Sequence, residues 1–118
     1  MIMSNYLAFF VEKLQKLKPY LIEKYSIKKI SVFGSFVRNE ATDESDLDIL
    51  VSFLDPPDLF DLASLDIFLE NELGVKVDLV PDMNLKPRIA QNIYSEKIDI
   101  FWRQNETARL KTQVWLLT

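Results

Sequence analysis

A glycine-serine turn followed by two closely spaced carboxylates constrains the fold of this chain more than any other feature. A short apolar run leads into Gly34-Ser35, and after ten further residues Asp46-Leu47-Asp48 opens a second apolar run. Side chains two apart on a strand point to the same side, so Asp46 and Asp48 should converge while Leu47 faces the other way. The spacing predicts two strands joined by a turn, with paired acids on one strand face.

Paired carboxylates at this spacing favour a divalent cation. Two carboxylates held close together repel each other unless a cation lies between them. Mg²⁺ suits such a site, because it binds carboxylate and phosphate oxygens together and keeps part of its water. An EF-hand calcium loop is excluded, since Leu50 stands where that loop needs an oxygen ligand. The chain contains no histidine and no cysteine, which disfavours a zinc site.

The glycine of the turn points to a phosphate ligand. A glycine at the end of a strand lets the backbone approach a phosphate closely with its N–H groups turned toward it, and the Ser35 hydroxyl can add a donor. Two alternatives stay open: Ser35 as a plain helix cap, and Arg38 as a surface charge. Dinucleotide-binding and P-loop fingerprints are excluded, because Gly34 and Gly74 are the only glycines. Turn and acids together predict a metal-dependent nucleotidyl transfer site.

This pattern resembles the minimal nucleotidyltransferase family of the DNA polymerase β-like superfamily. The resemblance covers roughly residues 25 to 101 and is carried by specific motifs. These are Gly34-Ser35, Arg38, Ser45-Asp46-Leu47-Asp48, Val77-Asp78-Leu79-Val80, Leu85-Lys86-Pro87-Arg88 and residues 93–98. Asn39 departs from the pattern, since family members often carry glycine after the arginine. The implied fold is α/β (α+β): a small mixed β-sheet of about four strands flanked by helices, the polymerase β-like nucleotidyltransferase fold.

The resemblance also implies roles for individual residues. Asp46, Asp48 and Asp78 would be the catalytic carboxylates and would hold two Mg²⁺ ions, with Asp78 taking the proton from the attacking hydroxyl. Nucleotide contacts would come from the turn and its surroundings, namely Gly34, Ser35, Arg38 and Ser45. Judged by residue type alone, Asp78 is more often an ordinary exposed aspartate at a strand end, and the resemblance reverses this interpretation.

Periodicity and turn residues predict the order of the elements. We expect an amphipathic helix over 4–24 with Ser4 or Asn5 as a possible cap, strands over 27–33, 46–53, 75–80 and 98–102, and helices over 59–73 and about 86–94. Gly74 should end the second helix in the C′ position. Residues 1–103 are expected to form one nucleotidyltransferase domain, and the order and role of the tail 104–118 stay open.

Charge is distributed unevenly along the chain. No lysine or arginine lies between Arg38 and Lys76, whereas eleven acidic residues do. This segment should repel a nucleic-acid backbone, so we expect no direct nucleic-acid partner. Most of these acids are expected to be solvated surface groups. The chain shows no signal peptide and no membrane-spanning run, which together with the lack of cysteine indicates a cytoplasmic protein without a membrane partner.

The length of the chain bears on the acceptor. With 118 residues there is no room for a separate acceptor-binding domain, so another chain is expected to supply the acceptor. The resemblance implies ATP as donor and a helical HEPN-domain toxin as partner, adenylylated on a hydroxyl such as that of tyrosine. Two alternatives stay open: an antitoxin that neutralises by binding alone, and an enzyme that modifies a small molecule such as an aminoglycoside. A hetero-oligomer and a homodimer are both compatible with the sequence.

Overall fold

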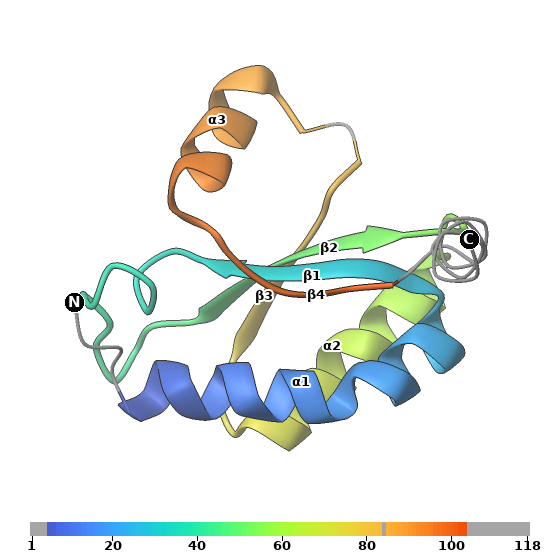
Figure 1. The fold of residues 1–118 in the computed structure, drawn as a ribbon, viewed down its shortest axis with the longest axis horizontal. Coiled ribbons are helices and arrows are strands. Elements are labelled where there is room, and N and C mark those ends of the chain that lie inside the picture. Colours follow the sequence, from blue (N-terminus) through green and yellow to red (C-terminus); the bar gives the residue numbers. More distant parts are fainter. Residues whose placement is uncertain (1–4, 84, 104–118) are drawn as a thin grey trace, which may run out of the picture.

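The computed structural model describes residues 5–83 and 85–103, which form a four-stranded mixed sheet with helices on both faces (Figure 1). The elements follow in the order α1 (Asn5–Tyr25), β1 (Ile27–Phe33), β2 (Leu47–Phe53), α2 (Leu59–Leu73), β3 (Val77–Pro81), α3 (Pro87–Glu96) and β4 (Ile98–Trp102). The predicted α/β class and mixed sheet are confirmed. No helix in the described part of the chain is long and apolar enough to cross a membrane.

The topology of the sheet brings four strand ends to one edge. The strand order is β3-β2-β1-β4, in which β1 runs antiparallel to β2 and β4 while β2 and β3 are parallel. Phe33 at the end of β1 pairs with Asp48, and Asp48 pairs with Asp78 at the start of β3. The end of β1 and the starts of β2, β3 and β4 therefore meet at the edge where the sequence predicts the site.

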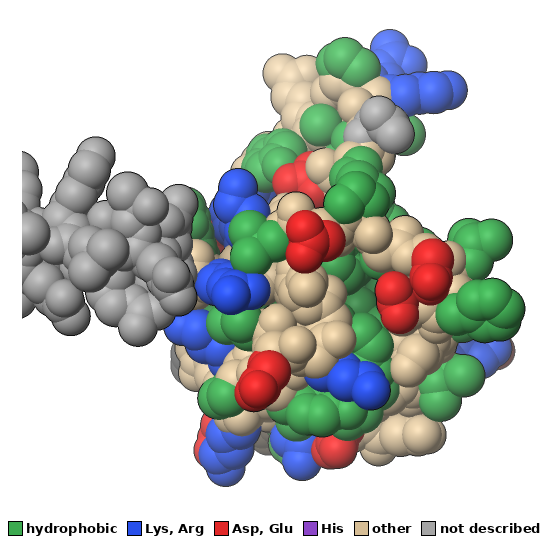
Figure 2. All heavy atoms as spheres, turned by 90° about the vertical axis from the view of Figure 1, so that its right-hand side faces the viewer, with side chains coloured by type: hydrophobic (Ala, Val, Ile, Leu, Met, Phe, Trp, Pro, Cys, Tyr) green, Lys and Arg blue, Asp and Glu red, His purple; other side chains and the backbone are tan. Residues whose placement is uncertain are grey.

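One face of the sheet forms the core with α1 and α2. Leu47, Ile49 and Val51 of β2 are fully buried in one cluster with leucines of both helices. Because side chains alternate along a strand, Asp48 belongs to the opposite face. That face is crossed by α3, which contributes only Ile93 as a buried residue and stands away from the body of the molecule (Figures 1 and 2).

Capping interactions determine where α2 begins and ends. Asp58 accepts a hydrogen bond from the Asp61 N–H at 2.7 Å, and the Asp61 carboxylate accepts from the Asp58 N–H in return, a capping box. Gly74 ends the helix with φ +71°, in the left-handed region that glycine adopts without strain. The prediction that Gly74 terminates this helix is confirmed.

Some predicted boundaries differ from the structure by one or two residues. The second strand begins at Leu47, so Asp46 lies just before it, and the third runs over Val77–Pro81, because pairing with β2 begins only with Leu47 and Val77. Helix α3 runs from Pro87 to Glu96, two residues beyond the predicted end. The predicted spans 27–33, 59–73 and 98–102 are confirmed. Ser4 and the tail 104–118 lie outside the described residues.

Candidate active site

Gly34 brings the turn after β1 into direct contact with Asp48. Its φ is +86°, and a Cβ built on it would lie 1.9 Å from Oδ2 of Asp48. Any side chain at this position would displace that carboxylate and strain the backbone. Glycine is therefore required for the Asp48 carboxylate to lie against the turn.

The turn after Gly34 is closed by its own backbone. The Arg38 N–H donates to the Gly34 carbonyl at 3.1 Å, and the Glu40 N–H donates to the Ser35 carbonyl at 2.8 Å. Asn39 has φ +61°, a left-handed conformation that asparagine tolerates better than most residues. Asn39 therefore adopts a left-handed conformation in the turn, although it stands where family members often carry glycine.

Asp48 and Asp78 lie side by side on neighbouring strands. They are direct partners in the parallel register of β2 and β3. Burial, the charge of Asp78 together with a hydrogen bond to it, and the charge of Asp46 raise the pKa of Asp48 to about 6, while the charge of Arg38 acts in the opposite direction. The structure therefore places Asp48, which is half-buried, next to Asp78 and within reach of the charge of Asp46, and both Asp46 and Asp78 are exposed.

The donors at this edge are of the kind that hard divalent cations bind. The donors are all carboxylates, and their mutual repulsion is the condition that a bound cation relieves. Within residues 5–83 and 85–103, no three such side chains are grouped tightly enough to enclose an ion by themselves. Substrate phosphate oxygens or a shift of side chains would have to complete the coordination.

Arg38 is held by two carboxylates. Its Nη1 donates to Oε1 and Oε2 of Glu96 at 3.0 and 2.9 Å, and its Nε donates to Glu40 at 3.0 Å. These hydrogen bonds, first that with Glu40 and then that with Glu96, raise the pKa of Arg38. Glu96 also accepts a hydrogen bond from the Gly34 N–H at 2.5 Å. No local sequence pattern predicts the role of Glu96, which the end of α3 brings back to a turn 62 residues earlier.

Known proteins resemble this chain over most of its length. The profile of a family described as nucleotidyltransferase domain matches residues 14–100. The chain belongs to this nucleotidyltransferase family. A Methanocaldococcus jannaschii protein named as a candidate protein adenylyltransferase is 45% identical over 86 residues, which are 72% of this chain and 88% of the relative. Protein adenylyltransferase MntA of Thermococcus cleftensis is 43% identical over 81 residues, 69% and 82% of the two chains.

Solved structures extend the similarity to the fold. A candidate minimal nucleotidyltransferase matches with a TM-score of 0.62 and 37% identity, over 75% of this chain and 93% of that one. A chain from the complex of tri-AMPylated Shewanella oneidensis HEPN toxin with MNT antitoxin matches with a TM-score of 0.59 over 91% of this chain and 85% of that one. At 18% identity, this second likeness concerns the fold alone.

In this nucleotidyltransferase, the other predicted nucleotide contacts occupy the turn itself. The Ser45 hydroxyl accepts a hydrogen bond from the Thr42 N–H at 2.8 Å, so in this structure it holds the turn in shape. Ser35 is half-buried, and its carbonyl accepts the bond from Glu40. Contact of either residue with a nucleotide stays a prediction.

Two cavities flank the site. The larger, about 600 Å³, lies against the start of α1 and the 36–45 segment, with an aromatic lining that includes Tyr6, Phe9 and Phe36. The smaller, about 260 Å³, lies between α2 and β3 and is lined by Asp78 and Asp66. Burial, then the charges of Glu70 and Asp78, raise the pKa of Asp66. Asp66 is thus an exception among the acids between Arg38 and Lys76, most of which are expected to be solvated: it is half-buried and lines the same cavity as Asp78.

Proposed function

We propose that this nucleotidyltransferase transfers AMP from ATP to a hydroxyl of a HEPN-domain toxin, most simply a tyrosine hydroxyl, and thereby acts as its antitoxin. The observation that carries the proposal is the contact of the Gly34 turn with Asp48 beside Asp78. It supports the proposal because a glycine turn next to adjacent carboxylates could bind a phosphate and a metal ion together. Relatives named as protein adenylyltransferases support the reaction, and a fold neighbour from a complex with an AMPylated HEPN toxin supports the partner.

The roles of the residues follow from their positions. Asp46, Asp48 and Asp78 would hold two Mg²⁺ ions, which when bound neutralise phosphate charge and stabilise the leaving pyrophosphate. The Gly34 turn would bind the triphosphate through backbone N–H groups. Asp78 would take the proton of the acceptor hydroxyl, whose oxygen forms a bond to the α-phosphorus as the bond to pyrophosphate breaks. The chain thus supplies positioning and charge, which are the main requirements of such transfers.

The acceptor would come from the partner. All seven elements of the described chain belong to the sheet and its three covering helices, which leaves no separate acceptor-binding domain among them. Adenylylation adds a bulky, negatively charged group to the toxin. Where the toxin must bind RNA phosphates, that group repels them and blocks access, which gives a physical route to silencing. We place both proteins in the cytoplasm, where ATP and RNA are present.

Intact-mass spectrometry of the partner tests the proposal. A candidate HEPN-domain partner is incubated with the nucleotidyltransferase, ATP and Mg²⁺, and its mass should rise by one AMP group or a multiple of it. The double variant Asp46→Asn/Asp48→Asn should still bind the partner and should not modify it. Full neutralisation without any mass increase would instead establish an antitoxin that acts by binding alone. ATP turnover with a small molecule and no partner would favour a small-molecule enzyme.

A further inference from the structure

We propose that Glu96 is an internal substitute for a nucleotide phosphate: in the nucleotide-free protein its carboxylate occupies the anion position at Gly34 and Arg38, and a triphosphate must displace it. This inference rests on the proposed function of the site. It assigns to α3 a role in nucleotide affinity that none of the sequence motifs indicates.

The hydrogen bonds of Glu96 are those expected of a bound phosphate. One of its oxygens accepts from the Gly34 N–H at 2.5 Å, and both accept from Nη1 of Arg38 at 3.0 and 2.9 Å. A carboxylate and a phosphate edge present similar pairs of charged oxygens to such donors. The single Gly34 N–H cannot point at both Glu96 and a phosphate. Bound nucleotide and this position of Glu96 therefore exclude each other.

Charge acts in the same direction. Glu40 also binds Arg38, so two carboxylates already occupy the one basic side chain of the turn. Asp46, Asp48 and Asp78 add further negative charge at the same edge of the sheet. A triphosphate entering while Glu96 stays in place would meet repulsion from it and gain nothing from Arg38. Displacement of Glu96 would release both Arg38 and the Gly34 N–H.

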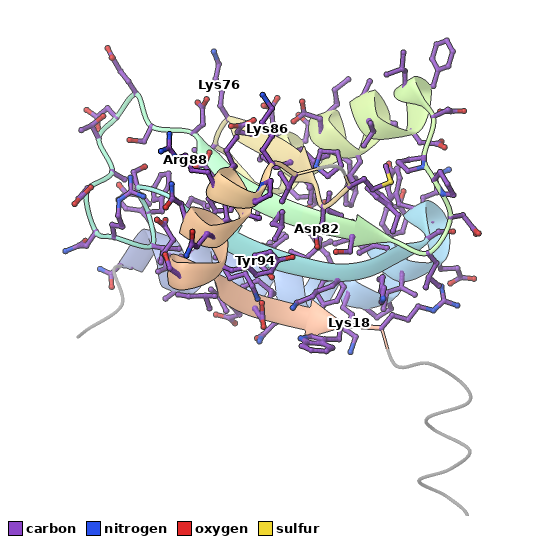
Figure 3. The ribbon with its side chains drawn as sticks, turned by 90° about the horizontal axis from the view of Figure 1, so that it is seen from above. Lys18, Lys76, Asp82, Lys86, Arg88 and Tyr94 are labelled. Atoms are coloured by element: carbon purple, nitrogen blue, oxygen red, sulfur yellow. The ribbon has the colours of Figure 1, made fainter. Side chains whose placement is uncertain are left out.

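The position of Glu96 makes its displacement feasible. It is the last residue of α3, the helix with a single buried residue, Ile93, which protrudes from the body of the molecule (Figure 2). Its side chain is 24% exposed. A separate hydrogen bond also holds α3: the Tyr94 hydroxyl donates at 2.8 Å to Asp82, which directly follows β3 (Figure 3). Glu96 can therefore turn away by a change of rotamer without disturbing the core shared by α1 and α2.

Calorimetry with ATP and Mg²⁺ tests the inference, because the inference predicts that removing the charge of Glu96 strengthens ATP binding. Glu96→Gln keeps the size of the side chain and removes its charge, and it should lower the dissociation constant about tenfold, the scale of one charge-assisted hydrogen bond. Glu23→Gln is the matched control: it makes the same change of charge at the far end of α1 and should leave affinity unchanged. Unchanged or weaker ATP binding by Glu96→Gln would overturn the inference. Weaker binding would mean that Glu96 supports nucleotide binding by orienting Arg38, and unchanged binding would mean that Glu96 does not compete with the nucleotide.

The Gly34 amide gives a second readout that needs no nucleotide. The chain has only two glycines, so their amide signals are readily identified by NMR. Glu96→Gln should move the Gly34 signal in the free protein, and ATP with Mg²⁺ should move it in the wild type, while Gly74 stays in place in both. If Glu96→Gln leaves the Gly34 signal unchanged, the result contradicts the hydrogen bond between the Gly34 N–H and Glu96. If the wild type binds ATP and only the Glu96 predictions fail, the proposed function survives; if it binds no ATP, both fail.

Discussion

Asp48 carries a negative charge among other negative charges and is partly withdrawn from water. Its pKa, raised to about 6 by burial, by Asp78 and by Asp46, lies above its ordinary value of 3.8. Between these two values the folded state binds a proton that the unfolded state has lost, so the free energy of unfolding falls as pH rises through this window. At neutral pH without metal, the ionised Asp48 therefore destabilises the fold.

Asp48→Asn should remove this cost. Without metal and near pH 7, we expect the variant to be more stable than the wild type by roughly 1 kcal/mol, a figure reduced for the partial solvent exposure of the group. The advantage should shrink as pH falls through about 6 toward 4. Urea denaturation across this range measures it. Asp55→Asn, in the exposed turn before α2, is the control and should show no such trend. A variant less stable than wild type at neutral pH would refute the electrostatic account.

The two glycines allow a matched comparison. Gly34→Ala and Gly74→Ala both place an alanine at positive φ, and this backbone strain alone should cost about 1 kcal/mol of stability at each position. Only at Gly34 does the new Cβ meet the Asp48 carboxylate, since the space beside Gly74 is empty to 4 Å. Gly34→Ala should therefore lose Mg²⁺-dependent ATP binding while Gly74→Ala keeps it. Thermal unfolding and calorimetry on both proteins check this, and equal ATP affinities would show that Gly34 serves the fold alone.

Single residues also show how far sequence analysis could reach. Local spacing predicts Gly34, Asp46 and Asp48 as site residues, and the resemblance to a known family predicts Asp78; the structure brings Asp48 next to Asp78, and the roles of these residues stay predictions. Glu96 and Asp66 could not be identified. Their importance comes from contacts across long stretches of chain, and neither stands in a local pattern that separates it from ordinary surface acids.

At the level of elements, α2 positions the third carboxylate. It connects β2 to the parallel strand β3, so its start and end determine where Asp78 meets Asp48. Periodicity and the terminal glycine predicted its span, 59–73, correctly. The ends of β3 and α3 were predicted less well, because pairing with β2 and the reach of α3 toward the turn depend on tertiary contacts that no local signal encodes.

Asp58→Ala should shorten or loosen the start of α2. It removes the side chain that accepts the Asp61 N–H, and loss of such a cap costs about 1 kcal/mol. The midpoint of urea unfolding should fall accordingly, and ATP affinity should change little, since the capped end is the start of the helix and β3 follows its other end. Asp55→Ala, just outside the helix, serves as the control. An unchanged midpoint for Asp58→Ala would show that the capping box contributes nothing to stability.

For the whole molecule, nucleotide and metal should stabilise the fold together. A ligand at about 100 times its dissociation constant adds about 2.7 kcal/mol to the free energy of unfolding. ATP with Mg²⁺ should therefore raise the melting temperature by several degrees, whereas ATP with a chelator should raise it little, because the carboxylates repel the uncompensated triphosphate. Differential scanning fluorimetry measures both. An equal shift with and without Mg²⁺ would contradict a metal-dependent site.

The order of elements along the chain has a kinetic consequence. Gly34 and Asp48 belong to one hairpin and are 14 residues apart, whereas Asp78 joins them only after 30 further residues that include all of α2. Hairpins form in about 1–10 μs, and parallel pairings across long connections form more slowly. A chain caught midway through folding would thus offer the phosphate turn without its proposed proton acceptor. During refolding, transferase activity should therefore return only when β3 pairs with β2. Only the completed fold would then modify another protein.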